Sequence, residues 1–347
     1  MTLLKKNKSD ILNDNKLNNC FLSAKLNNLD IECNIFKGNF YSDSFNYFPI
    51  TENYETFPEL FNWQVDNSLD HIFNEDFNYH LKEKINEFKI IENVFVLGSS
   101  PGDNYYSNLI YFLPRIFFND KTEIKLVVHR NLSNKFRKFI KEICKSLKKN
   151  INFVYLDDDF YSFKNSYIPQ FLEIKKSLKI LNFFINNFDN SSNDNEDLKI
   201  YVSRQNTNYR NVVNEDDLIH LLKQNNFKII DPNHLEIIEQ IQLFSKAKFV
   251  ISPTGSSLAN IIFCKPGTKI IEISPDYKHH YEQNISKRYE NLAQLVGLDF
   301  KKTMADSIKL NNISGLAKKY IDERVLKESL HYSDLIVKIN EFKKYLG

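Results

Sequence analysis

Residues 248–274, KFVISPTGSSLANIIFCKPGTKIIEIS, place two β-branched apolar runs on either side of a turn of small residues. Such runs predict buried strands, and the apolar spacing within SSLANIIF predicts a short helix between them. A strand, a helix and a second strand in this order favour two parallel strands joined by a right-handed crossover. We therefore expect an α/β fold around this stretch.

The same alternation extends on both sides. In the C-terminal half the predicted strands are LKIYVS (198–203) and FKIID (227–231). The predicted helices are NEDDLIHLLKQ (214–224) and LEIIEQIQLFSKA (235–247), and Asn214 is the expected N-cap of the first. In the N-terminal half the strands are NVFVLG (93–98), EIKLVVHR (123–130) and NINFVYLD (150–157), with helices YYSNLIYFL (105–113), which ends near Pro114, and SNKFRKFIKEICKSL (133–147). Each half therefore predicts a parallel sheet with helical crossovers.

The domain boundaries follow from the segments that break this alternation. The polar run NNFDNSSNDNED (186–197) has almost no apolar content, so it cannot bury a face and is expected to be a linker. The aromatic-rich segment NIFKGNFYSDSFNYFPI (34–50) predicts short strands or loops, and YSDLIVKINEFKKYL (332–346) predicts an amphipathic helix. We expect a Rossmann-like domain with an irregular N-terminal extension (1–185), the linker (186–197), a second Rossmann-like domain (198–325) and a C-terminal helix (326–347).

The composition argues against several classes of function. The 347 residues carry a formal net charge of only +2, which argues against a nucleic-acid partner. The four cysteines lack CxxC spacing, so neither a disulfide framework nor a zinc site is expected. The N-terminus lacks an apolar signal region, and no apolar run reaches the roughly 18 residues of a membrane span. We expect a soluble cytoplasmic protein, with peripheral membrane contact left open.

Two arginines follow the first predicted strand of the C-terminal domain. Arg204 comes directly after that strand, and Arg210 lies in the same loop. Two guanidinium groups at one strand end can hold a diphosphate through charge-assisted hydrogen bonds. The alternative is that both are surface charges, solvated or paired with Glu215 and Asp216.

The small-residue turn points to the same chemistry. Gly255, Ser256 and Ser257 stand where a strand meets a helix, and free amides at a helix start can bind an anion. A tight turn with a serine N-cap and no ligand is the alternative. Glu272, near the end of the next strand, is a candidate for ribose hydroxyls or for pairing with a lysine.

The N-terminal domain offers a second set of candidates. If its sheet is wound as predicted, Asp103, Asn104, Tyr105 and Ser107 face the interdomain cleft, although core packing is an alternative for Tyr105. Asp157 and Asp159 have the spacing of a metal-holding acid pair. Acids in surface turns are far commoner, so no metal is expected.

Taken together, these motifs resemble glycosyltransferase family 61. The resemblance covers residues from about 90 to 300 and is strongest over 201–273. There the family pattern has Ser-Arg after a strand, an Arg before Asn-Glu, an Asp-Pro, a Gly-[AS]-x-L-x-N turn, Pro-Gly-[TA] and a strand with Glu. The matching residues are Ser203, Arg204, Arg210, Asn214, Glu215, Asp231, Pro232, Gly255, Ser256, Leu258, Asn260, Pro266, Gly267, Thr268 and Glu272. Upstream, NYYSNLIYFLPRI (104–116) is similar to the family's Asn-Tyr-[YF]-His-Trp…Leu-Pro-Arg helix.

The resemblance implies a GT-B architecture, two Rossmann-like domains facing a cleft, and an inverting sugar transfer. It implies a nucleotide-sugar donor, a glycan or lipid-linked glycan acceptor, no cofactor and no essential metal. Bacterial relatives act in capsule, O-antigen or lipooligosaccharide synthesis, in some cases with membrane or assembly-complex contact. Carried over by position, the donor phosphates would contact Arg204, Arg210, Thr254, Gly255, Ser256, Ser257 and Asn260, and Glu272 would lie near the ribose. Asn104, Tyr105 and Arg115 would lie on the acceptor side.

The chain departs from the family pattern where a base is usual. Ser107 and Asn108 stand in place of His-Trp, Tyr111 stands where an acid is frequent, and Thr254 replaces a common His. The general base is therefore left open between Asp103 and Ser107. A non-catalytic member that binds a nucleotide-sugar or glycan, and a sugar-nucleotide 2-epimerase on the same scaffold, are the alternatives.

Overall fold

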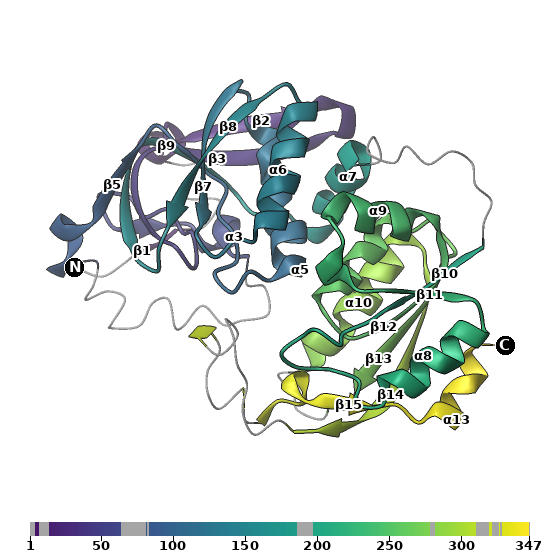
Figure 1. Ribbon diagram of the computed structural model, residues 1–347. Helices are drawn as coiled ribbons and strands as arrows, with labels where there is room; N and C mark the ends of the chain where they lie inside the picture. The colour runs from purple at the N-terminus through teal and green to yellow at the C-terminus, as the bar shows by residue number, and fades with distance from the viewer. Residues whose placement is uncertain are drawn as a thin grey trace. The chain divides into compact units, whose positions relative to one another are not determined.

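A computed structural model describes residues 4–6, 14–63, 81, 83–185, 197–277, 282–309, 319–320, 326 and 328–346 (Figure 1). The chain divides into two compact units, Met1–Ile180 and Leu181–Gly347, each with its own sheet and helices. The protein is therefore a mixed α/β protein. Apart from Asp197, the predicted linker lies outside the described residues.

Unit 2 contains a six-stranded sheet in the order β11-β10-β12-β13-β14-β15. Neighbours from β11 to β14 are parallel, and β15 is antiparallel to β14. All four strands predicted for this domain are present, whereas β14 was not predicted and β15 lies in a segment predicted to be helical. The strands are β10 (Leu198–Val202), β11 (Phe227–Ile230), β12 (Ala247–Pro253), β13 (Lys269–Pro275), β14 (Asp299–Ile308) and β15 (Asp334–Ile336).

Helices cover both faces of this sheet (Figure 1). One face is covered by α8 (Glu215–Gln224) and α13 (Ile339–Phe342), the other by α9 (Ile237–Lys246) and α10 (Gln283–Val296). The short 3₁₀ helix η8 (Ser256–Phe263) contacts α9 and α10. Strand residues alternate between the faces: Tyr201 packs in the cluster with Leu218 of α8, whereas its equally buried neighbour Ile200 is not in that cluster. Burial on both faces explains the near-continuous apolar strands.

The predicted C-terminal helix is wrong. Instead of one helix over 332–346, the segment forms η10 (Leu330–Tyr332), β15, α13 and η11 (Lys343–Tyr345). Leu335 and Val337 are buried on either side of the half-buried Ile336, which is a strand-like period of two. Leu335 also exchanges main-chain hydrogen bonds of 2.8 Å with Asn211 and Val213. Tertiary pairing therefore overrides the helical spacing.

Unit 1 contains a seven-stranded sheet, β2-β3-β9-β6-β7-β8, with β5 paired to β9. The predicted parallel strands β6, β7 and β8 are present, but β2 and β3 are antiparallel, so the sheet is mixed rather than wholly parallel. The segment expected to form short strands or loops contains most of one long strand, β3. The strands are β2 (Phe21–Leu26), β3 (Ile31–Asp43), β5 (Lys89–Glu92), β6 (Phe95–Val96), β7 (Glu123–His129), β8 (Asn150–Leu156) and β9 (Phe160–Pro169).

The helices of unit 1 include α6 (Asn134–Ser146), whose N-cap Ser133 accepts a hydrogen bond from the Phe136 amide. The helix expected to stop near Pro114 continues to Phe118, but its hydrogen-bonding pattern changes along the way. It begins as α5 (Tyr105–Ser107), continues as the π turn η4 (Asn108–Phe112) and ends as the 3₁₀ helix η5 (Leu113–Phe118). Pro114 is tolerated because it lies in the first turn of that segment. The boundary between the units falls within α7 (Ile174–Ile185).

Smaller elements complete the described part of unit 1. Strands β1 (Leu4–Lys5) and β4 (Glu55–Thr56) form a parallel pair. Short helical turns are α2 (Asn15–Asn18), η1 (Asn27–Leu29), α3 (Pro58–Phe61) and η3 (Ile85–Glu87). In unit 2, η7 (Pro232–His234) separates β11 from α9.

Candidate anion-binding site

The order of strands in unit 2 defines where a ligand is expected. Counted in chain order from β10 to β14, the strands stand in the order 2-1-3-4-5, so the winding reverses between β10 and β12. In open α/β sheets ligands bind beyond the carboxyl ends of the strands at such a switch point. Arg204 follows β10 and Gly255 follows β12, so the structure brings these two sequence motifs to that point.

Arg204 fills the space above Gly255. A Cβ atom built on Gly255 would lie 2.1 Å from Nη1 of Arg204, so only glycine fits there while the guanidinium keeps its place. The φ of Gly255 is 173°, an extended value open to any residue, so space rather than backbone conformation requires the glycine. Arg204 is 8% exposed and donates to two main-chain carbonyls, from Nε to Arg210 at 3.2 Å and from Nη2 to Tyr209 at 3.0 Å.

Arg210 lies in the same loop with its backbone in the left-handed region, at φ 59°. That conformation is uncommon for a long side chain and clusters at functional sites. The guanidinium is 6% exposed, and Nη1 lies 3.0 Å from Nε2 of His331. Its Cζ lies 4.9 Å from the centre of the Tyr209 ring, and the buried Nε has no hydrogen-bond partner among the described residues.

Neither guanidinium forms an ion pair with a described carboxylate. Among the described residues, no carboxylate lies within 4.0 Å of either group, although Glu215 was a candidate partner. Oε1 of Glu215 instead accepts from the Tyr201 hydroxyl at 2.7 Å and from the Arg204 amide at 3.2 Å. Burial, reinforced by the charge of Arg210, lowers the pKa of Arg204 to about 10. Among the described residues the two buried positive charges therefore form no ion pair, although the carboxylate of Glu272 interacts with Arg210 from farther away.

The start of η8 adds amide donors beside the arginines. Its first hydrogen bond runs from the Leu258 amide to the Gly255 carbonyl at 2.9 Å, which leaves the amides of Ser256 and Ser257 without a partner inside the helix. Both serines are half-buried, whereas Thr254 is buried. Asn260 is also buried and donates to Gln240 at 2.9 Å, so it ties η8 to α9.

Glu272 lies at the end of β13 beside a lysine. Its side chain is 1% exposed, and Oε2 lies 3.6 Å from Nζ of Lys302. The side chain of Thr254 also contacts the carboxylate. Burial raises the pKa of Glu272 against the opposing charge of Lys302. Lysine pairing, one of the two interpretations of the sequence, is therefore present.

Sequence reasoning missed His331 and Tyr277. His331 lies in η10, and its Nδ1 is 2.8 Å from the Tyr277 hydroxyl. Burial, followed by the charges of Arg210, Arg288 and Arg204, holds the pKa of His331 well below its usual value, so the ring is neutral at physiological pH. A single histidine in a segment with helical spacing gave no signal of this contact.

In unit 1, Asp103 lies in the loop that follows β6, at the carboxyl edge of the parallel strands. Its backbone is left-handed, at φ 49°, and Oδ1 accepts from the Ser133 amide and from Nδ2 of Asn108, both at 3.1 Å. Burial raises the pKa of Asp103 to about 6 despite these hydrogen bonds. Asn108 also accepts from the Ser100 amide at 2.7 Å, so the residue at the family's Trp position fixes the loop that holds Asp103.

The other candidates of unit 1 lie in different environments. Ser107 is half-buried, and its amide donates to Oδ1 of Asn104 at 3.1 Å, so the exposed Asn104 caps the helix. The Tyr105 ring packs edge-on against Phe136. Arg115 is 0% exposed: it donates to the Leu97 carbonyl at 2.6 Å and the Pro169 carbonyl at 3.0 Å, and lies 3.9 Å from the centre of the Phe171 ring.

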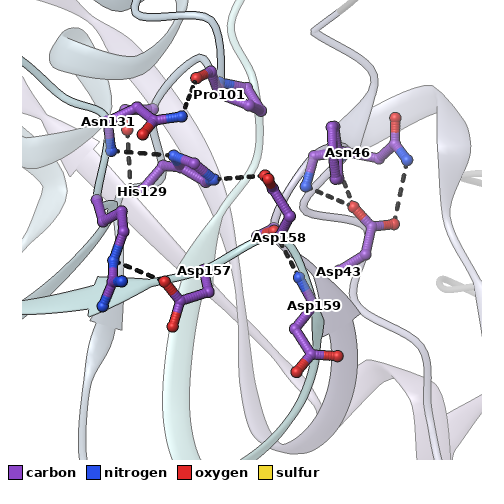
Figure 2. A network of polar contacts seen from close by, with 12 residues as sticks. Asp43, Asn46, Pro101, His129, Asn131, Asp157, Asp158 and Asp159 are labelled. Atoms are coloured by element: carbon purple, nitrogen blue, oxygen red, sulfur yellow. Dashed lines mark hydrogen bonds and ion pairs between the residues drawn. The ribbon is translucent and has the colours of Figure 1, made fainter. Parts of the chain in front are cut away.

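Figure 2 shows the acids that follow β8. Asp157 pairs with Nε of Arg130 at 2.6 Å, and Asp159 lies 3.6 Å from Nζ of Lys89. Asp158 contacts Nε2 of His129 at 2.9 Å, while Nδ1 of that ring accepts from the Asn131 amide at 3.1 Å.

Asp157 and Asp159 both lie within 4.0 Å of Nζ of Lys89, so each of these acids contacts a basic side chain or a histidine. In the described part of the chain, no group of three or more His, Cys, Asp and Glu side chains is arranged to hold a metal. A cavity of about 830 Å³ lies elsewhere in unit 1 and is lined by residues of β2, β6 and β7, but by none of the predicted site residues.

One comparison with known proteins finds a similarity, and it lies mostly in unit 2. The model of the family glycosyltransferase 61 matches residues 174–271, less than a third of the chain. A search of curated proteins finds no match. Among the described helices, none is both long and apolar enough to cross a membrane. The matched segment carries Arg204, Arg210 and Gly255, whereas Asp103 and His331 lie outside it, and the match indicates a glycosyltransferase.

Proposed function

We propose that this protein is an inverting glycosyltransferase that binds the diphosphate of a nucleotide-sugar at the switch point of unit 2. The observation that supports the proposal is the pair of buried guanidinium groups that form no ion pair with any described residue. An uncompensated buried charge costs several kcal/mol in proteins, by the order of magnitude of its desolvation. A site that binds an anion offsets this cost when the ligand arrives.

The same groups suit the departure of the nucleotide. Negative charge builds up on the diphosphate as the bond to the sugar breaks, and preorganised positive groups stabilise that charge. Arg204 and Arg210 offer planar donors that match phosphate oxygens, and the amides of Ser256 and Ser257 add neutral donors. In this proposal the arginines take the role that a metal ion has in other transferases.

For the acceptor we assign Asp103 as the general base. A base works best when its pKa lies close to the operating pH, and burial raises the pKa of this carboxyl to about 6. The anchoring of Oδ1 by Ser133 and Asn108 would hold the group in one orientation. The neutral hydroxyl of Ser107 is a much weaker base, so it is not retained in this role. Nor is Arg115 retained as an acceptor contact, because its guanidinium is occupied by main-chain carbonyls.

The wider assignment extends the resemblance. It comprises a GT-B arrangement of the two units, a metal-independent reaction, a glycan or lipid-linked acceptor, and a role in bacterial surface polysaccharide synthesis in the cytoplasm or at the inner face of the membrane. The family-model match supports the transferase chemistry. Glu272 remains the candidate for the ribose.

Calorimetric titration with nucleoside diphosphates, nucleoside monophosphates and nucleosides tests the binding step. We expect diphosphates to bind and nucleosides to bind far more weakly, because the arginines recognise phosphate. Release of nucleoside diphosphate from a panel of nucleotide-sugars then tests catalysis. Absence of binding by every diphosphate contradicts the proposal, and binding without turnover favours a non-catalytic binding protein.

A further inference from the structure

The segment 329–337 lies outside the part of the chain that the family model matches, yet it is attached to the arginine loop. The Leu335 amide donates to the Asn211 carbonyl, and the Val213 amide donates to the Leu335 carbonyl, both at 2.8 Å. Asn214 and Val337 exchange two hydrogen bonds of 2.8 and 3.0 Å. The segment therefore fixes the loop just after Arg210 and carries His331 to it.

The contacts of His331 define its protonation. Nη1 of Arg210 lies 3.0 Å from Nε2 of His331 and 3.4 Å from Nδ1, so the guanidinium lies beside both ring nitrogens. A guanidinium can only donate, so the neutral ring is the acceptor in this contact. Nδ1 is also 2.8 Å from the Tyr277 hydroxyl, which can donate or accept. A protonated ring would lose the bond to Arg210 and place a third positive charge beside two arginines.

The neutrality of this partner matters for an anion site. A carboxylate at the same place would hold Arg210 equally well, but it would cancel the charge that an anionic ligand needs. A neutral imidazole fixes the guanidinium and leaves its charge available. Arg204 is held in the same way, because its partners are main-chain carbonyls.

We propose that His331 is a positioning residue that holds Arg210 as a neutral acceptor, so that the segment 329–337 completes the diphosphate site. This inference rests on the proposed function, because it assumes that Arg210 contacts the anion. It assigns the C-terminal segment a direct part in donor binding.

Three variants of the full chain separate positioning from simple packing. His331→Gln keeps a neutral acceptor, His331→Glu introduces a carboxylate, and His220→Glu makes the same charge change at an exposed position on α8. The probes are inorganic pyrophosphate and one nucleoside diphosphate that the parent binds. Dissociation constants come from calorimetry and Tm from thermal unfolding.

We expect His331→Glu to weaken binding of both probes about tenfold or more, the size expected when a charged contact is lost, without lowering the Tm. His331→Gln should stay within about threefold of the parent, because an amide oxygen can replace the ring as acceptor. His220→Glu should leave both quantities unchanged.

Parent-like affinity of His331→Glu would overturn the inference while leaving the proposed function intact. Equal losses of affinity in His331→Gln and His331→Glu, or losses that follow the Tm, would also overturn it, since either indicates packing alone. A parent protein that binds neither pyrophosphate nor any nucleoside diphosphate would contradict the proposed function itself, and the inference with it.

Discussion

The charged side chains at the carboxyl edges of the two sheets have different partners. In unit 1, Asp157, Asp158 and Asp159 each contact a basic side chain, and the buried Arg115 is enclosed by main-chain carbonyls and an aromatic ring. In unit 2, Arg204 and Arg210 are nearly as buried. Among the described residues, none of the three arginines forms an ion pair with a carboxylate, so neither burial nor the lack of an acid marks a candidate site. All three guanidinium nitrogens of Arg115 donate to main-chain carbonyls, whereas Nε of Arg210 has no hydrogen-bond partner among the described residues.

The largest expected effect separates the two kinds of arginine. Arg115→Met should lower the free energy of unfolding of unit 1 by about 2–6 kcal/mol, at about 1–3 kcal/mol for each of the two carbonyls left without a donor. Arg210→Met should change the stability of unit 2 by less, or increase it, because it removes an uncompensated charge. Trp63, the only tryptophan of the chain, lies in unit 1, so its fluorescence during denaturation reports on that unit. Equal losses of unfolding free energy in Arg115→Met and Arg210→Met would contradict the difference drawn between these two arginines.

The affinity for nucleoside diphosphates should change most in the variants of unit 2 and least in Arg115→Met. Arg204→Ala and Arg210→Ala should each weaken binding by about 1–3 kcal/mol, the range for a hydrogen bond to a charged group. Arg115→Met, measured below its unfolding temperature, should bind normally because that guanidinium is fully occupied. Isothermal titration gives all three values. Unchanged affinity in both unit 2 variants would contradict an anion site.

Gly255→Ala tests why the turn is glycine. The added methyl group would collide with Nη1 of Arg204, so binding should weaken about as much as in Arg204→Ala. The double variant should be no worse than Arg204→Ala alone, with a coupling of about 0.5–3 kcal/mol, as for residues in direct contact. If the two losses add, the glycine acts independently of the arginine, for example by admitting phosphate to the amides.

Asp103→Asn should have a smaller, pH-dependent effect on stability. The folded-state pKa of about 6 exceeds the ordinary value of 3.8, so the folded protein binds this proton more tightly and loses stability as pH rises from about 4 through 6. The Asn variant lacks this loss and should gain at most about 3 kcal/mol over the parent at pH 7, by the size of the pKa shift. Denaturation followed by Trp63 fluorescence at pH 4 and pH 7 measures the change.

The same substitution tests the assigned base. Turnover by the parent should fall below a pH of about 6 as Asp103 takes up a proton, and Asp103→Asn should be nearly inactive at every pH. A gain in stability with full activity would assign Asp103 to the structure of its loop alone.

The smallest effects are expected at the paired acids of unit 1. Asp157→Asn and Asp159→Asn remove partly exposed ion pairs, each worth roughly 0–1 kcal/mol. Activity should survive EDTA, because the arginines supply the positive charge. If chelation abolishes turnover and Mn²⁺ restores it, these acids would be assigned as metal ligands. The two sheet edges would then no longer differ in having a ligand site.

The sequence predicted the part of the fold in which local and tertiary preferences agree. The runs around Ile200, Val250 and Ile270 are apolar on both faces, so the parallel strands of unit 2 were recognisable. Since carboxyl ends of parallel strands share an edge, the meeting of Arg204 with Gly255 could also be expected. The sequence could not predict that Arg204 itself occupies the space above Gly255, because this contact depends on side-chain packing across two loops.

Other features depended on contacts that no local pattern encodes. Arg115 was expected on the acceptor side, but it is buried and donates to the carbonyls of Pro169 and Leu97, which are far from it in the sequence. His331 lies in η10, beside a segment with helical spacing that becomes the strand β15 through its pairing with β14 and with the loop after Arg210. The raised pKa of Asp103 comes from burial that the sequence does not show.

The pairing of Leu335 with the arginine loop also has a consequence for biosynthesis. Asn214 and Val337 are 123 positions apart, so the loop meets its partner only after almost all of unit 2 has been translated. Closing so long a connection is a late and entropically costly step of folding. We therefore expect a nascent chain on the ribosome to form the sheet of unit 2 before it can retain a nucleotide. Donor binding would then begin only when synthesis of this unit is nearly complete.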